Sequence, residues 1–187
     1  MEGKAETIQG LDPLVGLVLS GKKPGAYIDL RNKEKCEKLG LEAVPTRYFN
    51  GSIWVERLAV GNRQLVSDVL RSKKISEIPR LKNRVRALIN ELNGKSVVQA
   101  LAYLVEYPRK DKEFPIVEEN RVERPEFAML IGILLGYRED CVKYYIETKY
   151  LGFPTDFKAE KRYASERDNP VAYLQCPACV SNNLPYS

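Results

Sequence analysis

The spacing of apolar residues changes along the chain, from the alternation typical of strands to the three- or four-residue repeat typical of helices. Strand-like runs occur early, at residues 26–30 and on both sides of Asn50-Gly51. Asn-Gly fits a type I′ turn, whose central residues need positive φ, so residues 46–49 and 52–60 predict a β-hairpin. With a short helix predicted at residues 32–39, this part predicts a β-α-β-β unit, a three-stranded sheet with one face to cover.

Helical spacing accounts for most of the remaining chain. Asp12 and Pro13 are a typical cap and first residue for a short helix that ends before Gly21. After Gly61 the apolar stripes predict further helices at about residues 62–71, 77–92 and 96–107. We expect Asn62 to cap the first of these and Leu65 to lie on its apolar stripe.

The most apolar stretch of the sequence is residues 127–135. A helix that is apolar on all sides is normally a central, buried one. Gly136 is suited to end it in a left-handed turn, and residues 138–150 predict a second helix with acidic residues in its first turn. The fold predicted by these patterns is an α+β fold, in which a small N-terminal β-α-β-β sheet packs against a mainly helical body.

The chain is long enough for one domain, residues 1–187. Residues 108–123 are charged and are interrupted by Pro115, which is typical of a connector. Because long loops are uncommon inside compact domains, an alternative is a subdivision into an α/β part, residues 1–107, and a helical part, residues 124–187.

Composition indicates a soluble globular protein, since 44% of the residues are hydrophobic and 29% are charged. No apolar run approaches the roughly 18 residues that a membrane span needs, and the N-terminus lacks the pattern of a signal peptide. We therefore expect a cytoplasmic protein without a membrane partner. The scarcity of Met and Gln beside many Lys, Glu and Arg favours a thermophilic source.

The sequence contains no histidine. This removes the commonest general base, the commonest metal ligand and any nucleophile paired with histidine. The acidic pairs Glu118-Glu119 and Glu139-Asp140 are typical of solvated positions, since adjacent helical residues do not face each other. No catalytic residue is assigned, no cofactor is required, and the balance favours a protein that is not an enzyme.

The four cysteines carry the main chemical question. Cys176 and Cys179 form a Cys-x-x-Cys knuckle that can supply two corners of a tetrahedral zinc or iron site. Cys141 can supply a third ligand, with Cys36 or Asp140 as the fourth. Inert burial and a structural disulfide are the alternatives. A redox role needs a helix after the first cysteine of the knuckle, and residues 180–187 are too short to form one.

The positive charge is concentrated between residues 61 and 95, where nine Lys or Arg residues stand against three acids. Such a segment can bind nucleic acid through phosphate contacts. A solvated helix face is the alternative, because the basic residues flank both sides of an apolar stripe. The candidate nucleic-acid contacts are Arg71, Lys73, Lys74, Arg80, Lys82, Arg84 and Arg86.

Residues 132–137 (Gly-Ile-Leu-Leu-Gly-Tyr), followed by Cys141 and Tyr144-Tyr145, resemble the signature of an uncharacterised, largely archaeal protein family. In that family Leu-Gly-Tyr-Pro precedes a Cys-Cys pair, and further cysteines lie near the C-terminus. Here Arg138 replaces the proline and Asp140 the first cysteine. The resemblance implies a similar fold and a cytoplasmic archaeal protein, and it implies no activity.

Three functions remain open at this point. The leading hypothesis is a non-enzymatic binding or structural protein with a C-terminal cysteine cross-link. The alternatives are a cysteine-held metal module and a nucleic-acid-binding protein that uses the basic face between residues 71 and 86.

Overall fold

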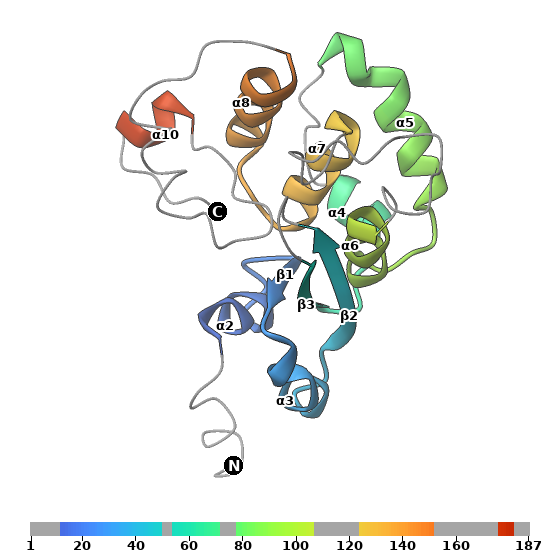
Figure 1. Ribbon diagram of the computed structural model, residues 1–187, viewed down its shortest axis with the longest axis vertical. Coiled ribbons are helices and arrows are strands. Elements are labelled where there is room, and N and C mark those ends of the chain that lie inside the picture. Colours follow the sequence, from blue (N-terminus) through green and yellow to red (C-terminus); the bar gives the residue numbers. More distant parts are fainter. Residues whose placement is uncertain (1–11, 50–53, 72–77, 107–123, 152–175, 182–187) are drawn as a thin grey trace.

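A three-stranded antiparallel sheet lies against a group of helices (Figure 1). The structure is a computed structural model that describes residues 12–49, 54–71, 78–106, 124–151 and 176–181. Its strands are β1 (Gly25–Ile28), β2 (Glu42–Phe49) and β3 (Trp54–Gly61), in the spatial order β1-β3-β2. The predicted α+β class and the β-α-β-β unit are confirmed.

Apart from η1 and α10, which the sequence did not predict, the helices of the described residues follow the predicted order. The first part has α2 (Pro13–Leu19), the 3-10 turn η1 (Leu30–Asn32), α3 (Lys33–Lys38) and α4 (Val66–Arg71). The helical body adds η2 (Pro79–Leu81), α5 (Lys82–Glu91), α6 (Val97–Glu106), α7 (Pro125–Leu134), α8 (Glu139–Tyr150) and α10 (Pro177–Ser181). None of the helices in these ranges has the length and apolar character that a bilayer crossing requires.

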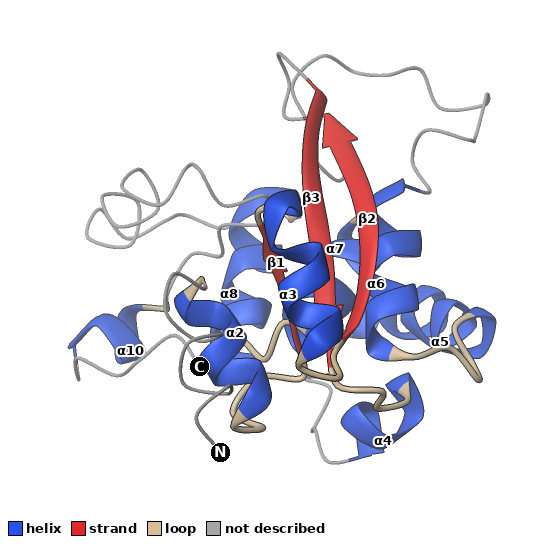
Figure 2. Cartoon of the chain, turned by 90° about the horizontal axis from the view of Figure 1, so that it is seen from below, coloured by secondary structure: helices blue, strands red, loops and turns tan. Residues whose placement is uncertain are grey.

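Helices cover the sheet on both faces, whereas the sequence predicted only one covered face (Figure 2). Because side chains alternate along a strand, Ala26 and Ile28 point to one face and Tyr27 to the other. The first face packs against α2 and α3. The second belongs to the large core of the helical body, where the Tyr27 hydroxyl donates to the Leu101 carbonyl at 2.8 Å. Every residue of β1 is therefore buried.

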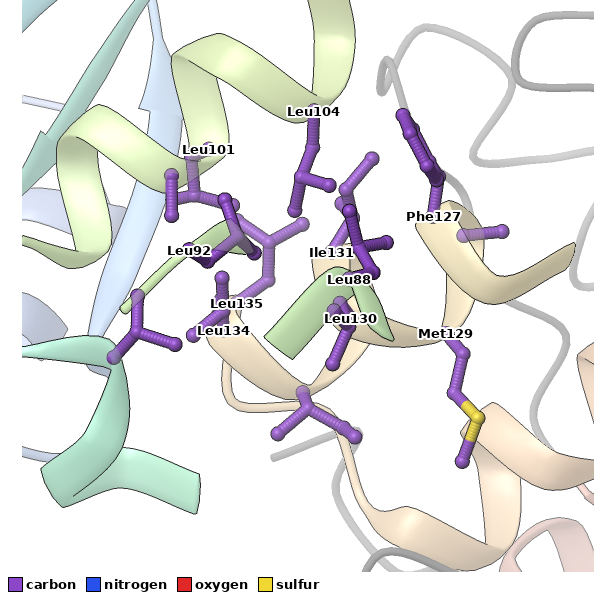
Figure 3. Close-up of a cluster of buried hydrophobic side chains, with 14 of the residues drawn as sticks. Leu88, Leu92, Leu101, Leu104, Phe127, Met129, Leu130, Ile131, Leu134 and Leu135 are labelled. Atoms are coloured by element: carbon purple, nitrogen blue, oxygen red, sulfur yellow. The ribbon is translucent and has the colours of Figure 1, made fainter. Parts of the chain in front are cut away.

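Helix α7 lies at the centre of that core, as its sequence predicted (Figure 3). All its residues from Glu126 to Leu134 are buried. Its neighbours include α4, α5, α6 and α8. Leucines of α5, of its C-cap and of α6 approach it from one side, and they are Leu88, Leu92, Leu101 and Leu104.

Two sets of contacts stabilise the C-terminal end of α7. Gly136 adopts the left-handed conformation, with φ of 76°, and the Tyr137 amide donates back to the Gly132 carbonyl at 3.0 Å. This is the Schellman pattern that glycine permits. From the N-terminal part, the buried Lys23 donates its Nζ to the Leu135 carbonyl at 3.1 Å and lies 4.7 Å from the Tyr137 ring centroid. Burial lowers the pKa of Lys23.

Two local predictions near α4 were wrong. Asn62 does not cap the helix, because its side-chain amide donates to the Val18 carbonyl at 2.9 Å. Leu65 lies before α4, in a β-bridge with Ser96, and is 42% exposed. The bridge holds the start of α4 beside the start of α6, so the backbone rather than the apolar stripe decides where Leu65 points. The predicted turn at Asn50-Gly51 and the connector 108–123 lie outside the described residues.

Helix α6 approaches the sheet closely at a pair of glycines. Gly25 of β1 and Gly61 of β3 are opposite each other in the strand register. A Cβ atom on Gly61 would lie 2.8 Å from the Pro24 carbonyl oxygen and 2.9 Å from a Val98 methyl carbon. Both distances are shorter than real Cβ contacts, so glycine at this position allows α6 to pack onto the sheet.

We predict that Gly61→Ala destabilises the protein by about 1–3 kcal/mol, because the added methyl group meets backbone that cannot move aside. Gly16→Ala is the matched control, since Gly16 lies in α2 and an added Cβ there meets nothing within 4 Å. The control should stabilise the protein by about 0.5–1 kcal/mol through its helix propensity. Chemical denaturation measures both, and equal effects of the two substitutions would contradict the close approach.

Candidate metal centre

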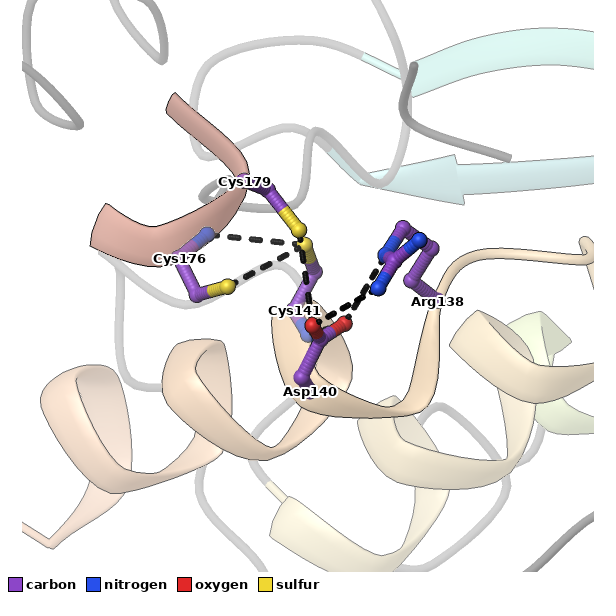
Figure 4. Close-up of polar contacts among 5 residues, drawn as sticks. All are labelled: Arg138, Asp140, Cys141, Cys176 and Cys179. Carbon is purple, nitrogen blue, oxygen red and sulfur yellow. Dashed lines mark hydrogen bonds and ion pairs between the residues drawn. The ribbon is translucent and has the colours of Figure 1, made fainter. Parts of the chain in front are cut away.

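Four side chains with metal-binding atoms meet between the start of α8 and the C-terminal segment (Figure 4). They are Asp140, Cys141, Cys176 and Cys179, and their ligand atoms all lie within 4.8 Å of one another. The cluster joins residues about 35 positions apart in the chain. It brings together the three cysteines named by the sequence analysis and one of the two proposed fourth ligands.

The cluster begins with the turn that ends α7. After Gly136, Arg138 is extended and α8 starts at Glu139, which places Asp140 and Cys141 in the first helical turn. The Val142 amide donates to the Arg138 carbonyl at 2.9 Å and closes this turn. Helix α8 packs on the buried α7, so the position of Cys141 is fixed by the core.

The other two cysteines come from the knuckle Cys176-Pro177-Ala178-Cys179. Helix α10 starts at Pro177, the position where proline is well tolerated. Residues three apart in a helical turn lie on the same side, so Cys176 and Cys179 both face α8. The sequence predicted that residues 180–187 are too short to supply a helix after the knuckle. Helix α10 instead begins inside the knuckle, and Val180 and Ser181 are its last residues.

The distances inside the cluster fit tetrahedral coordination. The Sγ atoms of Cys141 and Cys176 are 3.8 Å apart, and Cys179 Sγ lies 3.4 Å from Asp140 Oδ2. With zinc–sulfur bonds of about 2.3 Å and a zinc–oxygen bond of about 2.0–2.2 Å, tetrahedral angles put two sulfurs roughly 3.8 Å apart and a sulfur and an oxygen roughly 3.6 Å apart. These two pairs therefore already lie near the separations of ligands that share one ion, and the remaining pairs lie within 4.8 Å.

Asp140 is oriented by an arginine. Arg138 contacts both carboxylate oxygens, with Nε 3.2 Å from Oδ1 and a terminal nitrogen 3.1 Å from Oδ2. The Cys141 backbone amide also donates to Oδ1, at 2.9 Å. Partial burial alone would raise the pKa of Asp140, but the hydrogen bonds from Arg138, Cys179 and the Cys141 amide outweigh it and lower that pKa. The carboxylate is thus held ionised and aimed at the sulfurs.

The thiols are buried, since Cys141 and Cys179 are 0% exposed and Cys176 is 6% exposed. Burial raises the pKa of the Cys141 and Cys179 thiols, because a thiolate without a partner is poorly solvated there. The Cys176 backbone N–H points at Cys141 Sγ at 3.5 Å and opposes that rise. A cation is the partner that would offset burial of the thiolates, since metal binding displaces their protons.

Cys36 is not part of this cluster. It lies in α3 and packs in the small core between α2, α3 and the sheet, together with Leu41 and Leu58. Burial raises the pKa of its thiol, and the acidic Asp12 and Glu37 add to that effect. Of the two proposed fourth ligands, Cys36 and Asp140, the structure brings only Asp140 to the other three residues.

The described candidate nucleic-acid contacts are all exposed: Arg71, Arg80, Lys82, Arg84 and Arg86. Arg71 lies 3.9 Å from Asp68 on the same helix, and Arg84 pairs with Glu126 of α7 at 2.9 Å. Lys73 and Lys74 lie outside the described residues. Nucleic-acid binding by this face stays a prediction.

Sequence reasoning undervalued Asp140. Against the archaeal family signature, aspartate in place of cysteine removes a thiolate and counts against a metal site. The missed signal was local: an arginine two residues before Asp140 can orient a carboxylate, and the start of a helix lets that carboxylate turn back towards its own backbone.

Comparison of the chain with protein-family models, curated proteins and solved structures found no match. The resemblance to the archaeal family therefore stays a prediction, and the function has to be argued from the cluster itself.

The four sulfurs are free thiols, because the Cys141–Cys176 separation is far longer than the roughly 2.05 Å of a disulfide. We predict that protein purified without reductant, then unfolded with a chelator present, reacts with four equivalents of a thiol reagent. Two equivalents would mean that a disulfide has formed in place of the cluster. Before unfolding, we expect slow reaction at every cysteine, because all are buried.

Proposed function

We propose that this protein is a non-enzymatic binding or structural protein in which one zinc ion, held by Asp140, Cys141, Cys176 and Cys179, cross-links the C-terminal segment to α8. The observation that carries the proposal is the convergence of four ligand atoms within 4.8 Å. Such a convergence of three thiols and a carboxylate has no obvious use in packing alone, since the carboxylate adds a charge to a sulfur-lined contact.

The compactness of the cluster favours a single ion over an iron–sulfur cluster. Thiolates that bind such a cluster surround several iron and sulfide atoms, so their sulfurs stand further apart than the ligands of one ion. A separation of 3.8 Å between Cys141 and Cys176 matches two ligands of the same ion. Among divalent ions, thiolate-rich tetrahedral sites favour zinc over ferrous iron, and mononuclear iron is the alternative occupant.

The donor set supports a structural rather than a catalytic role. A structural zinc site has four protein ligands, whereas a catalytic site leaves one position for water or substrate. Here the chain supplies four ligands, and three of them are buried. Arg138 holds the fourth, Asp140, through two hydrogen bonds, which hinders its replacement by a solvent molecule.

The cross-link would stabilise the fold by restricting the unfolded chain. Cys141 and Cys176 are 35 positions apart. A covalent link that closes a loop of this length removes chain entropy worth about 3–4 kcal/mol. A metal bridge adds the binding free energy of its ligands, less the cost of removing their protons. Within the described part of the chain, the small core at the C-terminal end consists of Cys141, Cys176 and Cys179, with Tyr144 packed beside them.

We predict about one equivalent of zinc in the purified protein and a loss of more than about 90% of it in Cys176→Ser, because three remaining ligands bind zinc far more weakly. Elemental analysis measures the content. Removal of zinc by a chelator should lower the melting temperature of the native chain by roughly 5–15 °C, the shift expected for a few kcal/mol in a chain of this size.

Cys36→Ala is the matched control, since it also replaces a buried cysteine but lies outside the cluster. It should keep its zinc and lose stability by only about 1 kcal/mol, the cost of a small cavity. Substoichiometric metal in the wild type, or equal zinc in Cys176→Ser and Cys36→Ala, would refute the proposal.

A further inference from the structure

The three cysteines of the metal cluster lie close enough to react with one another (Figure 4). Their ligand atoms, with that of Asp140, all lie within 4.8 Å of one another. The Sγ atoms of Cys141 and Cys176 are 3.8 Å apart. A disulfide would bring them to about 2.05 Å, and rotation of the two side chains can share this change of less than about 2 Å. The two segments of the cluster can therefore be joined by a covalent bond as well as by a metal ion.

Hydrogen bonds distinguish one pair among the three cysteines. The Cys176 backbone N–H points at Cys141 Sγ at 3.5 Å and holds that sulfur beside the Cys176 side chain. Cys179 Sγ lies 3.4 Å from Asp140 Oδ2, and Arg138 holds this carboxylate through two hydrogen bonds. Cys179 thus has an acceptor for its thiol proton once a metal leaves. Cys141 and Cys176 remain as the pair that can join.

Access to the cluster from solvent runs past Cys176. This residue is 6% exposed, whereas Cys141 and Cys179 are 0% exposed. An oxidant therefore has to be small, and it meets Cys176 first. Hydrogen peroxide is the smallest peroxide, and it oxidises cysteine thiolates to sulfenic acids, which condense with a second thiol to a disulfide. Because bound zinc keeps its cysteine ligands deprotonated, the cluster holds its sulfurs in the form that peroxide attacks.

We propose, on the basis of the zinc site proposed above, that hydrogen peroxide oxidises this cluster to a Cys141–Cys176 disulfide and thereby releases the zinc ion. The Cys176 thiolate attacks one peroxide oxygen, the O–O bond breaks, and hydroxide leaves as a sulfenic acid forms. The Cys141 thiolate then attacks the Cys176 sulfur and displaces a second hydroxide. Two thiolates are oxidised to one disulfide, one peroxide is reduced to two hydroxides, and these take protons from solvent to become water.

The oxidised protein loses its metal but keeps its cross-link. Asp140 and Cys179 are then the two ligands left, and a structural zinc ion needs four. The disulfide joins the same two segments as the metal did, so the C-terminal segment stays attached to α8. A thiol reductant reverses the reaction by exchange and restores the zinc ligands. The cluster is thus a switch that releases zinc under oxidation without loss of the fold.

The test is treatment of the full chain, purified with its zinc, with an excess of hydrogen peroxide. We expect the bound zinc to pass to a chromogenic chelator as two of the four thiols are lost. Mass spectrometry of the digested protein should map one disulfide to Cys141 and Cys176. Zinc retained after oxidation, or a disulfide mapped mainly to Cys176 and Cys179, would overturn the proposal.

Elemental analysis before the addition of peroxide separates this proposal from that of the zinc site. A chain that carries no zinc at the outset refutes both. A chain that carries zinc and keeps it after oxidation refutes only the release. The oxidised chain should also melt at least about 5 °C above the reduced, metal-free chain, because the disulfide closes a long loop. Equal melting temperatures would contradict a disulfide between α8 and the C-terminal segment.

Two variants, compared with the wild type in the metal-free state, locate the disulfide without dependence on zinc affinity. Cys179→Ser keeps the predicted pair and should form the disulfide as the wild type does. Cys176→Ser removes one partner and should lose it. Equal disulfide formation in the two variants would refute the pairing, and the mapping on the wild-type chain decides the question if either variant fails to fold.

Cys36→Ala is the matched control, because Cys36 packs with Leu41 and Leu58 in the small core that includes α2 and α3. It should release its zinc and form the disulfide as the wild type does. Retention of zinc by oxidised Cys36→Ala would show that Cys36 takes part in the reaction and would overturn the assignment.

Discussion

Helix α7 is enclosed on every side, and the rest of the structure is arranged around that fact. A helix buried all round leaves its neighbours no freedom to slide without opening a cavity, and cavities in a packed core are costly. Helices α5 and α6 pack on it from one side and α8 from another. The N-terminal part joins through Lys23, which donates to the carbonyl of Leu135, the residue that follows the helix.

The metal cluster depends on α7 through one turn. Gly136 ends the helix in a left-handed conformation, and α8 begins three residues later. Asp140 and Cys141 are therefore placed by the core. Cys176 and Cys179 come from the short segment 176–181, whose apolar cluster among the described residues is Cys141, Cys176 and Cys179 with Tyr144. The rigid half of the site orients its ligands in advance. The other half is the part of the chain that a bound metal would stabilise most.

The sequence predicted those features that local physics decides. The apolar run 127–135, the glycine after it and the acids at the start of α8 correctly gave two helices and the turn between them. The features that it did not predict depend on contacts between distant segments. The sequence predicts that Asn62 caps a helix, but its side chain donates instead to the Val18 carbonyl. It predicts that Leu65 lies in the core, but Leu65 forms a β-bridge with Ser96.

In the candidate metal site, too, local spacing predicted some ligands, whereas others depend on contacts between distant segments. The spacing of Cys176 and Cys179 indicated a pair of ligands, but spacing could not decide between Cys36 and Asp140 as the fourth. Cys36 is buried on the far face of the sheet, and only the fold shows this. The burial of Glu126 was not predicted, because an acidic residue in the first turn of a helix is ordinary in sequence and becomes unusual only when buried.

X-ray absorption at the zinc edge of the native protein tests the central claim most directly, because it counts the atoms bound to the metal. We expect three sulfur neighbours at about 2.3 Å and one oxygen neighbour at about 2.0–2.2 Å. A shell of four sulfurs would exclude Asp140 as a ligand. A shell of oxygen or nitrogen alone would place the metal outside the cysteine cluster and contradict the account.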